Sequence, residues 1–258
     1  MQDGMYSALF GALTQEHRMN TIANNLANVN TTGYKRDRMA FRDVFVRFAH
    51  DVIREPVLNV RSKPLFPEPD YLSKVRIAES RIDFSQGSMK KSDNPLDLAI
   101  SGEGFFKVRN DNGDYYTRNG HFTVGPDGLI VNADGHQLLG EGGPIAVPPS
   151  TRLSVTADGQ IFADGEALDA IQLSTVSDLT ALRKVGQNLF EIHPDRQAVE
   201  EPALEAQVAQ GYLEAPNVEV VTEMVKMIET QRSFEAYQKV ITTSKETDSN
   251  AINKVGKV

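Results

Sequence analysis

Apolar side chains recur at alternating steps of four and three residues at both ends of the chain, and this spacing constrains the fold more than any other feature. In the first 30 residues the stripe consists of Met5, Leu9, Ala12, Met19, Ala23 and Leu26, with Glu16 filling the one polar slot. Such spacing places side chains along one face of an α-helix and is typical of a coiled-coil seam. A helix from Asp3 to about Val29 would be roughly 40 Å long.

The C-terminal stripe is longer. It consists of Val220, Met224, Met227, Phe234, Ile241, Ile252 and Val255, with Gln231 as a polar member. We expect a helix that begins after Pro216, with Asn217 as its N-cap. If unbroken it would be about 58 Å long, more than a small globular domain can cover. Part of its stripe must therefore meet something other than the middle of the same chain.

The middle of the chain, residues 82–215, has a β pattern. Short runs rich in β-branched and aromatic residues are separated by Gly, Asn, Asp and Pro. An internal echo is present, because Asp127-Gly128 and Asp134-Gly135 are followed by Asp158-Gly159 and Asp164-Gly165. Asp-Gly favours tight turns with positive φ, so the echo predicts two similar hairpins.

Residues 34–81 show no clear period, and Pro56, Pro64, Pro67 and Pro69 interrupt them. We interpret this segment as an irregular connector. The predicted fold is therefore α+β. Residues 1–33 and 216–258 form a discontinuous coiled-coil domain, and the β-rich domain of residues 82–215 is inserted between its halves.

Composition narrows the classes of partner. The net charge of −8 argues against nucleic acid, and the lack of cysteine excludes disulfides and Cys-based zinc sites. No run of about 18 apolar residues is present, so we expect no membrane insertion. The first residues have neither the basic start nor the apolar stretch of a cleavable signal peptide.

No motif predicts catalysis or a cofactor. The five histidines have no metal-ligand spacing, and Gly102-Glu103-Gly104 has Lys107 where a dinucleotide loop needs its third glycine. The run from Asp111 to Asp114 is better explained as a hairpin turn than as a calcium loop. We therefore expect no catalytic residue, no metal and no cofactor.

Asparagines cluster on the N-terminal helix at Asn20, Asn24, Asn25 and Asn28. Asn is a poor helix former, so this cluster needs a reason. Two explanations are equally open: a solvated face near a fraying end, or amides that hydrogen-bond between packed helices and fix their register.

Three sets of residues resemble the bacterial flagellar rod and hook proteins. They are the run from Asn24 to Lys35 (NNLANVNTTGYK), the β-region motifs NPLDLAISGEGFF from Asn94 and YTRNG from Tyr116, and the closing helix from Met224 to Phe234. The resemblance implies a non-enzymatic subunit that leaves the cell through the flagellar type III export apparatus. It also implies assembly with its own copies and with other rod proteins into the periplasmic rod, the drive shaft that transmits torque from motor to hook.

Within this family, the run from Gly140 to Ile145 and the run from Val240 to Ser244 are most like those of proximal rod subunits. The length of the stretch from Ser62 to Asp93 is nearer to that of distal rod subunits, which remain the main alternative. A β-rich module that binds peptidoglycan is a less favoured alternative. The residues we expect at the assembly interface are Met5, Leu9, Met19, Asn24, Asn25, Leu26, Asn28, Val220, Met224, Met227, Gln231, Phe234 and Ile241.

Overall fold

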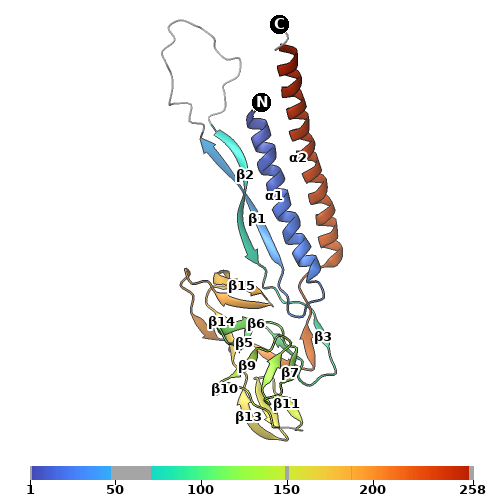
Figure 1. Ribbon diagram of the computed structural model, residues 1–258. Helices are drawn as coiled ribbons and strands as arrows, with labels where there is room; N and C mark the ends of the chain where they lie inside the picture. Colours follow the sequence, from blue (N-terminus) through green and yellow to red (C-terminus); the bar gives the residue numbers. More distant parts are fainter. Residues whose placement is uncertain (1, 48–70, 149–150, 187, 256–258) are drawn as a thin grey trace. The chain divides into compact units, whose positions relative to one another are not determined.

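A computed structural model of the chain describes residues 2–47, 71–148, 151–186 and 188–255 (Figure 1). Helix α1 (Gln2–Ala27) opens the chain and helix α2 (Val220–Val255) closes it. The described strands lie between the two helices, so the α+β class with terminal helices and a β-rich middle is confirmed.

The strands are short, apart from the first two. They are β1 (Asp37–Arg47), β2 (Tyr71–Ile82), β3 (Met89–Lys91), β4 (Leu98–Ser101), β5 (Phe105–Asn110), β6 (Gly113–Thr117), β7 (Phe122–Val124), β8 (Ile130–Asn132), β9 (Gln137–Gly140), β10 (Gly143–Pro144), β11 (Leu153–Val155), β12 (Gln160–Ala163), β13 (Glu166–Ala170), β14 (Leu173–Val176), β15 (Leu182–Gly186), β16 (Leu189–Ile192), β17 (Glu200–Pro202), β18 (Gln207–Gln210) and β19 (Tyr212–Glu214). A 3₁₀ turn, η1 (Leu179–Ala181), precedes β15.

The chain divides into two compact units. The first contains α1 up to Ala23, the paired strands from Met39 to Ser80 so far as they are described, and α2 from Met224. The second contains residues 24–38 and 81–223. The asparagine-rich end of α1 thus packs with the β-rich unit.

The irregular conformation expected for residues 34–81 is wrong at both described ends of that segment. Strands β1 and β2 pair as a two-stranded sheet. In β2, Val75 and Ile77 alternate with Lys74 and Arg76, which is a period-two strand pattern. The four prolines that suggested an irregular connector lie outside the described residues.

The second unit is built around a ten-stranded antiparallel sheet. Its main path runs β15-β16-β6-β5-β9-β8-β7, while β10 pairs with β9, and β14 pairs with both β5 and β17. A three-stranded sheet, β11-β12-β13, and the pairs β18-β4 and β19-β3 complete the unit. The last strands before α2 therefore return to the first strands of the unit.

The Asp-Gly echo marks two similar antiparallel meanders, β7-β8-β9 and β11-β12-β13. All four glycines of the echo have positive φ, between +75° and +93°. At the β12–β13 turn Asp164 also has positive φ, which is the backbone of a type I′ hairpin. The prediction of two similar hairpins from this echo is confirmed.

Two apolar clusters fill the second unit. The larger includes Phe106, Phe122, Leu138 and Ile161, and the smaller is centred on Phe105 and Phe190. Phe105 and Phe106 are adjacent in β5, so their side chains lie on opposite faces of the strand, and each belongs to one of the two clusters. The β-rich unit therefore has a core of its own.

The loop after α1 depends on one glycine. Gly33 has φ +66°, and a Cβ at this position would lie 2.3 Å from the carbonyl oxygen of Arg118. Any other residue would meet both backbone strain and a collision with backbone. Gly33 therefore both ends the helical segment and packs against the backbone of Arg118.

Helix α2 begins two residues later than expected, and Asn217 is not its N-cap. The side-chain oxygen of Asn217 accepts a hydrogen bond from the Arg36 backbone N–H at 2.8 Å, and its amide donates to the carbonyl of Asp83 at 2.7 Å. Glu219 immediately precedes the helix instead. Its backbone carbonyl accepts from the Glu223 N–H at 3.0 Å, and its carboxylate accepts from the Thr222 hydroxyl at 2.7 Å. Asn217 therefore joins separate segments of the second unit.

Candidate assembly interface

The buried face of α1 is rich in small side chains. Ala8, Gly11, Ala12, Thr14 and Ile22 are buried on it. Of the predicted stripe, Met5, Met19 and Leu26 are half-buried, while Leu9 is 44 % exposed. The predicted stripe and the buried face therefore share some positions and diverge at others.

On α2 too, the predicted stripe only partly coincides with the buried face. Its buried and half-buried positions repeat at steps of four and three residues: Glu223, Met227, Thr230, Phe234, Tyr237, Ile241, Ser244 and Asp248. Met227, Phe234 and Ile241 belong both to this set and to the predicted stripe. Val220 and Met224 are exposed by 37 % and 49 %, and Gln231 is exposed. The period of the helix was predicted correctly, but three of the six members of the predicted stripe whose side chains are described, Val220, Met224 and Gln231, are exposed.

Small residues on α1 allow a large side chain of α2 to approach closely. A Cβ at Gly11 would lie 2.5 Å from Cε1 of Tyr237, so the aromatic ring occupies the space that any other residue at position 11 would need. On another side of α1, the Thr21 hydroxyl lies 3.0 Å from Sδ of Met39 at the start of β1. These contacts lie within the first unit, where α1 and α2 run side by side (Figure 1).

Large apolar side chains point away from these buried faces. On α1 they are Tyr6, Leu9 and Leu13, spaced three and four residues apart, and on α2 they include Val221, Met224, Val225 and Ile228. Leu13 is 43 % exposed and Ile228 is 52 % exposed. We call these seven residues the outer apolar stripes. Apolar surface grouped in this way on a helix marks an interaction site more often than a solvated face.

The asparagine cluster is used within the chain. Asn25 is buried, its amide donates to the Asp37 carbonyl at 3.0 Å, and its oxygen accepts from the Asp37 N–H at 2.9 Å and from the Tyr34 hydroxyl at 3.2 Å. Asn28 donates to the carbonyl of Asn24 at 2.9 Å. Asn25 thus holds the chain where it leaves α1, and this use of its amide is neither of the two explanations that the sequence left open.

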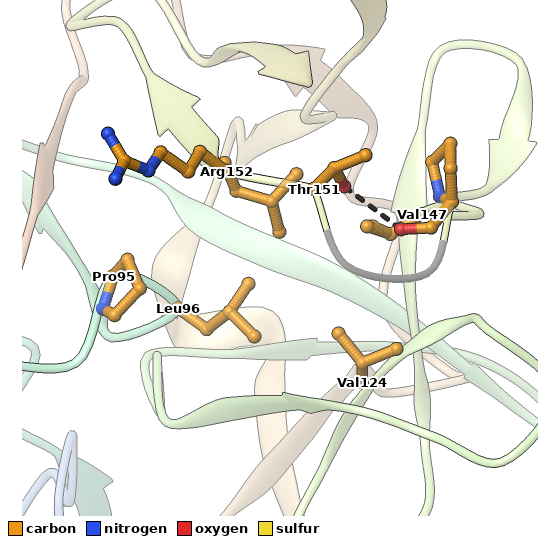
Figure 2. Close-up of a pocket in the computed structure, with 8 residues that line it drawn as sticks. Pro95, Leu96, Val124, Val147, Thr151 and Arg152 are labelled. Atoms are coloured by element: carbon orange, nitrogen blue, oxygen red, sulfur yellow. Dashed lines mark hydrogen bonds between the residues drawn. The ribbon is translucent and has the colours of Figure 1, made fainter. Parts of the chain in front are cut away.

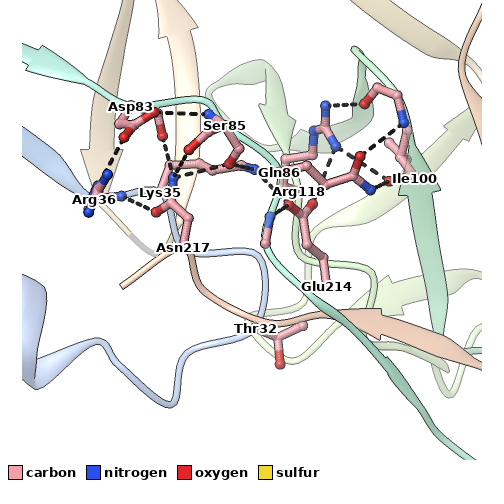
Figure 3. Close-up of polar contacts among 12 residues, drawn as sticks. Thr32, Lys35, Arg36, Asp83, Ser85, Gln86, Ile100, Arg118, Glu214 and Asn217 are labelled. Atoms are coloured by element: carbon pink, nitrogen blue, oxygen red, sulfur yellow. Dashed lines mark hydrogen bonds and ion pairs between the residues drawn. The ribbon is translucent and has the colours of Figure 1, made fainter. Parts of the chain in front are cut away.

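A buried ion cluster lies beneath this exit, and no sequence pattern predicted it (Figure 3). Nζ of Lys35 lies 2.6 Å from Oε1 of Glu214, and Nη1 of Arg118 lies 3.3 Å from Oε2 of the same carboxylate. The three side chains are at most 4 % exposed. Lys35 and Arg118 belong to the two motifs that resemble the rod and hook family, which is the signal that marks them in the sequence.

The cluster connects five segments of the second unit. Lys35 donates to the Ser85 carbonyl at 2.9 Å, the Gly87 N–H donates to Glu214 at 2.8 Å, and Arg118 donates to the Gly102 carbonyl at 2.7 Å. Burial lowers the pKa of the Lys35 ammonium, and the adjacent Glu214 carboxylate opposes that shift. The cluster is a structural clamp in which every charge has a partner.

No group of three or more His, Asp or Glu side chains in the part of the chain that the structure describes is arranged to hold a metal ion. No described helix is long and apolar enough to cross a membrane.

Three family profiles match the chain at both ends and in the middle. Residues 5–35 match the flagella basal body rod protein family, residues 99–163 match the flagellar hook protein FlgE/F/G D1 domain, and residues 209–254 match the flagellar basal body rod FlgEFG protein C-terminal family. The first and last profiles cover most of α1 and α2, and the second covers the strands from β4 to β12.

Curated relatives match along the whole chain. The flagellar basal-body rod protein FlgF of Caulobacter vibrioides is 33 % identical, and the match covers all of both chains. FlgF of Escherichia coli is 30 % identical over 97 % of this chain and 96 % of its own length. FlgG of Buchnera aphidicola (subspecies Acyrthosiphon pisum) is 34 % identical over 91 % of this chain and 92 % of its own.

The terminal helices, the inserted β-rich unit, the motifs clustered at the exit from α1 and the full-length matches all agree. They confirm the predicted function as a structural subunit of the rod. The chain belongs to the family of flagellar basal-body rod proteins.

Proposed function

We propose that the chain is a non-catalytic, FlgF-type subunit of the proximal rod, and that it joins the rod through the outer apolar stripes of its terminal helices. In this proposal α1 and α2 pair as a coiled coil, with Gly11 receiving Tyr237, and the outer stripes contact neighbouring subunits. The rod so formed lies in the periplasm and transmits torque from motor to hook.

The exposure of the outer stripes is the observation that carries this proposal. Leu9, Leu13, Met224 and Ile228 are all between 43 % and 52 % exposed. Burying the remaining half of a leucine or isoleucine is worth roughly 1 kcal/mol, so a stripe of such residues supplies several kcal/mol on assembly. A monomer gains nothing from leaving these side chains in water.

Both halves of the predicted interface have a place in this proposal. Met5, Met19, Leu26, Met227, Phe234 and Ile241 stabilise the helix pair, while Leu9, Val220, Met224 and Gln231 face the neighbouring subunit. Asn24, Asn25 and Asn28 hold the exit of α1 in shape, so that the helices leave the β-rich unit at a fixed point.

The partners follow from family membership and from geometry. In this proposal a patch on one subunit meets a different patch on the next subunit. Such a head-to-tail contact produces an open helical polymer when it does not close into a ring. We propose that the neighbours are other copies of this chain and other rod proteins. Delivery in this proposal is through the flagellar type III export apparatus.

Cysteine labelling tests the proposal, because the natural chain contains no cysteine. Leu13→Cys and Ile228→Cys should react with a maleimide in the purified chain and be protected in isolated basal bodies. Val185→Cys is the matched control, since Val185 lies in β15 of the second unit and is 48 % exposed. Equal labelling of Ile228→Cys in the free chain and in basal bodies would contradict the proposed interface.

A further inference from the structure

An apolar groove on the second unit has no role in the account above (Figure 2). Its volume is about 530 Å³, and it is lined by Pro95, Leu96, Val124, Val147, Pro148, Thr151, Arg152 and Leu153. Thr151 and Arg152 are its only polar side chains, and the Thr151 hydroxyl is already used on the Pro148 carbonyl at 2.9 Å. An occupant that fits is therefore an apolar side chain accompanied by one negative charge.

The walls of the groove are fixed in place. The amide of Gln210 donates to the Pro95 carbonyl at 2.8 Å and to the Leu153 carbonyl at 3.1 Å, and its oxygen accepts from the Val155 N–H at 3.1 Å. One side chain at the end of β18 thus joins both walls. A preformed groove costs little ordering entropy when it binds.

Arg152 supplies the positive charge. The Arg152 N–H donates to the Asp164 carboxylate, and the Arg152 carbonyl accepts from the Asp164 N–H, each at 3.0 Å. The guanidinium makes no ion pair with any residue that the structure describes. In Figure 2 its side chain extends along the groove opposite Pro95.

A matching projection lies elsewhere on the same unit. Leu204 is 89 % exposed, the most exposed of the large apolar side chains that the structure describes. Its turn is held by hydrogen bonds from the Ala203 N–H to the Leu173 carbonyl at 3.0 Å and from the Ala206 N–H to the Ala203 carbonyl at 3.2 Å. Ala206 is buried, so the turn is anchored while Leu204 projects into solvent.

Carboxylates flank this leucine. Glu201 and Glu205 are both exposed, and neither makes an ion pair with a described residue. The projection therefore carries an apolar side chain and free negative charge, which is the complement of the groove.

We propose that Leu204 of one copy inserts into the groove of a second copy, with Glu205 of the first copy paired to Arg152 of the second. This contact rests on the proposed function, because it adds a β-unit contact between subunits to the helical one. The turn precedes β18, and the groove lies at the other end of that four-residue strand, where Gln210 contacts it. Leu204 and Gln210 are therefore at most about 20 Å apart along the chain. A contact between two different patches is head-to-tail, and it builds an open helix when the rotation between copies does not close a ring.

Cysteine cross-linking tests the contact. Cells that make Val124→Cys chains together with Leu204→Cys chains should give a disulfide-linked dimer in isolated basal bodies, and neither variant alone should give it. Val199→Cys replaces Leu204→Cys in the matched control, because Val199 is also exposed (66 %) but is not part of the turn that carries Leu204. No dimer above this control would overturn the proposal.

Charge reversal provides a second readout. Arg152→Glu should reduce the cross-link yield about twofold to fivefold, as expected for loss of one exposed ion pair, and Glu205→Lys on the partner chain should restore it. A yield that does not respond to either charge would overturn the pairing of Arg152 with Glu205.

The failure of this contact can be told apart from failure of the helical interface. If Ile228→Cys is protected in basal bodies but the Val124–Leu204 cross-link is absent, the proposed function stands and only the groove contact falls. If Val124→Cys is protected without linking to Leu204→Cys, another occupant fills the groove and the second copy is excluded. If Ile228→Cys remains reactive there, the proposed function itself falls.

Discussion

Lys35 and Glu214 are 179 positions apart in the sequence, yet Nζ of one lies 2.6 Å from Oε1 of the other, and both side chains are 1 % exposed. Lys35 follows α1 closely and Glu214 precedes α2 closely. This ion pair therefore joins the chain leaving one terminal helix to the chain entering the other. It holds together the two segments of the β-rich unit that connect it to the terminal helices.

Glu214→Gln should lower the free energy of unfolding by about 3–5 kcal/mol. The amide keeps the size of the side chain but leaves the ammonium of Lys35 and the guanidinium of Arg118 buried without a counter-charge. Urea unfolding of the purified chain, followed by circular dichroism, measures the loss. Asp114→Asn is the matched control, because Asp114 pairs with Arg109 at the surface and its loss should cost no more than about 1 kcal/mol. Equal effects of the two substitutions would refute the clamp.

Gly11→Val should loosen the helix pair. The new side chain would overlap the ring of Tyr237, and overpacking of this kind costs about 1–3 kcal/mol. Hydrogen exchange should become faster at amides of α1, and Tyr237→Ala in the same chain should partly reverse the change. Ser7→Val controls for helix propensity, because Ser7 is exposed on the same helix. If Tyr237→Ala does not relieve the effect of Gly11→Val, the two residues are not packing partners.

Glu200 should make the β-rich unit sensitive to acid. Burial of Glu200 opposes its ionisation, but hydrogen bonds from Ser174, Lys107 and Tyr116 outweigh burial and lower the pKa of the carboxyl below its ordinary value of 4.5. A depressed folded pKa stabilises the fold above the unfolded pKa, and that contribution disappears as the pH falls through the folded value. The stability difference between the natural chain and Glu200→Gln should therefore be constant above about pH 5 and shrink below it. Urea midpoints across this range measure the difference, and a gap that widens in acid would contradict the assignment.

The features of the fold that repeat were predictable from the sequence. The four-three spacing predicted both helices, because it places apolar side chains on one face only in a helix. The Asp-Gly echo predicted the turns of both meanders, because Asp-Gly favours tight hairpin turns. Which face of each helix is buried was not predictable. Gly11 and Ala12 form the buried face since small residues let Tyr237 approach, whereas Leu9 and Met224 face outward, and hydrophobicity alone ranks these positions in the opposite order.

The contacts between distant segments were also missed. The role of Asn25 was not predictable, because its amide bonds to the backbone of Asp37, which the chain brings back against α1 only in the folded structure. Lys35 and Glu214 read as ordinary surface charges, because charged residues are rarely buried and nothing local indicates that these two meet. Strands β1 and β2 were obscured by prolines in a segment outside the described residues.

Replacement of Ile228 by Asp is the most direct test of the central claim, that the outer apolar stripes are covered on assembly. Rod incorporation is measured by isolating basal bodies from a strain that lacks its own copy of the gene and makes the variant chain. Ile228→Asp should leave the purified chain folded but abolish its incorporation, while Arg232→Asp, an exposed polar position on the same helix, should be tolerated. Normal incorporation of Ile228→Asp would contradict the account.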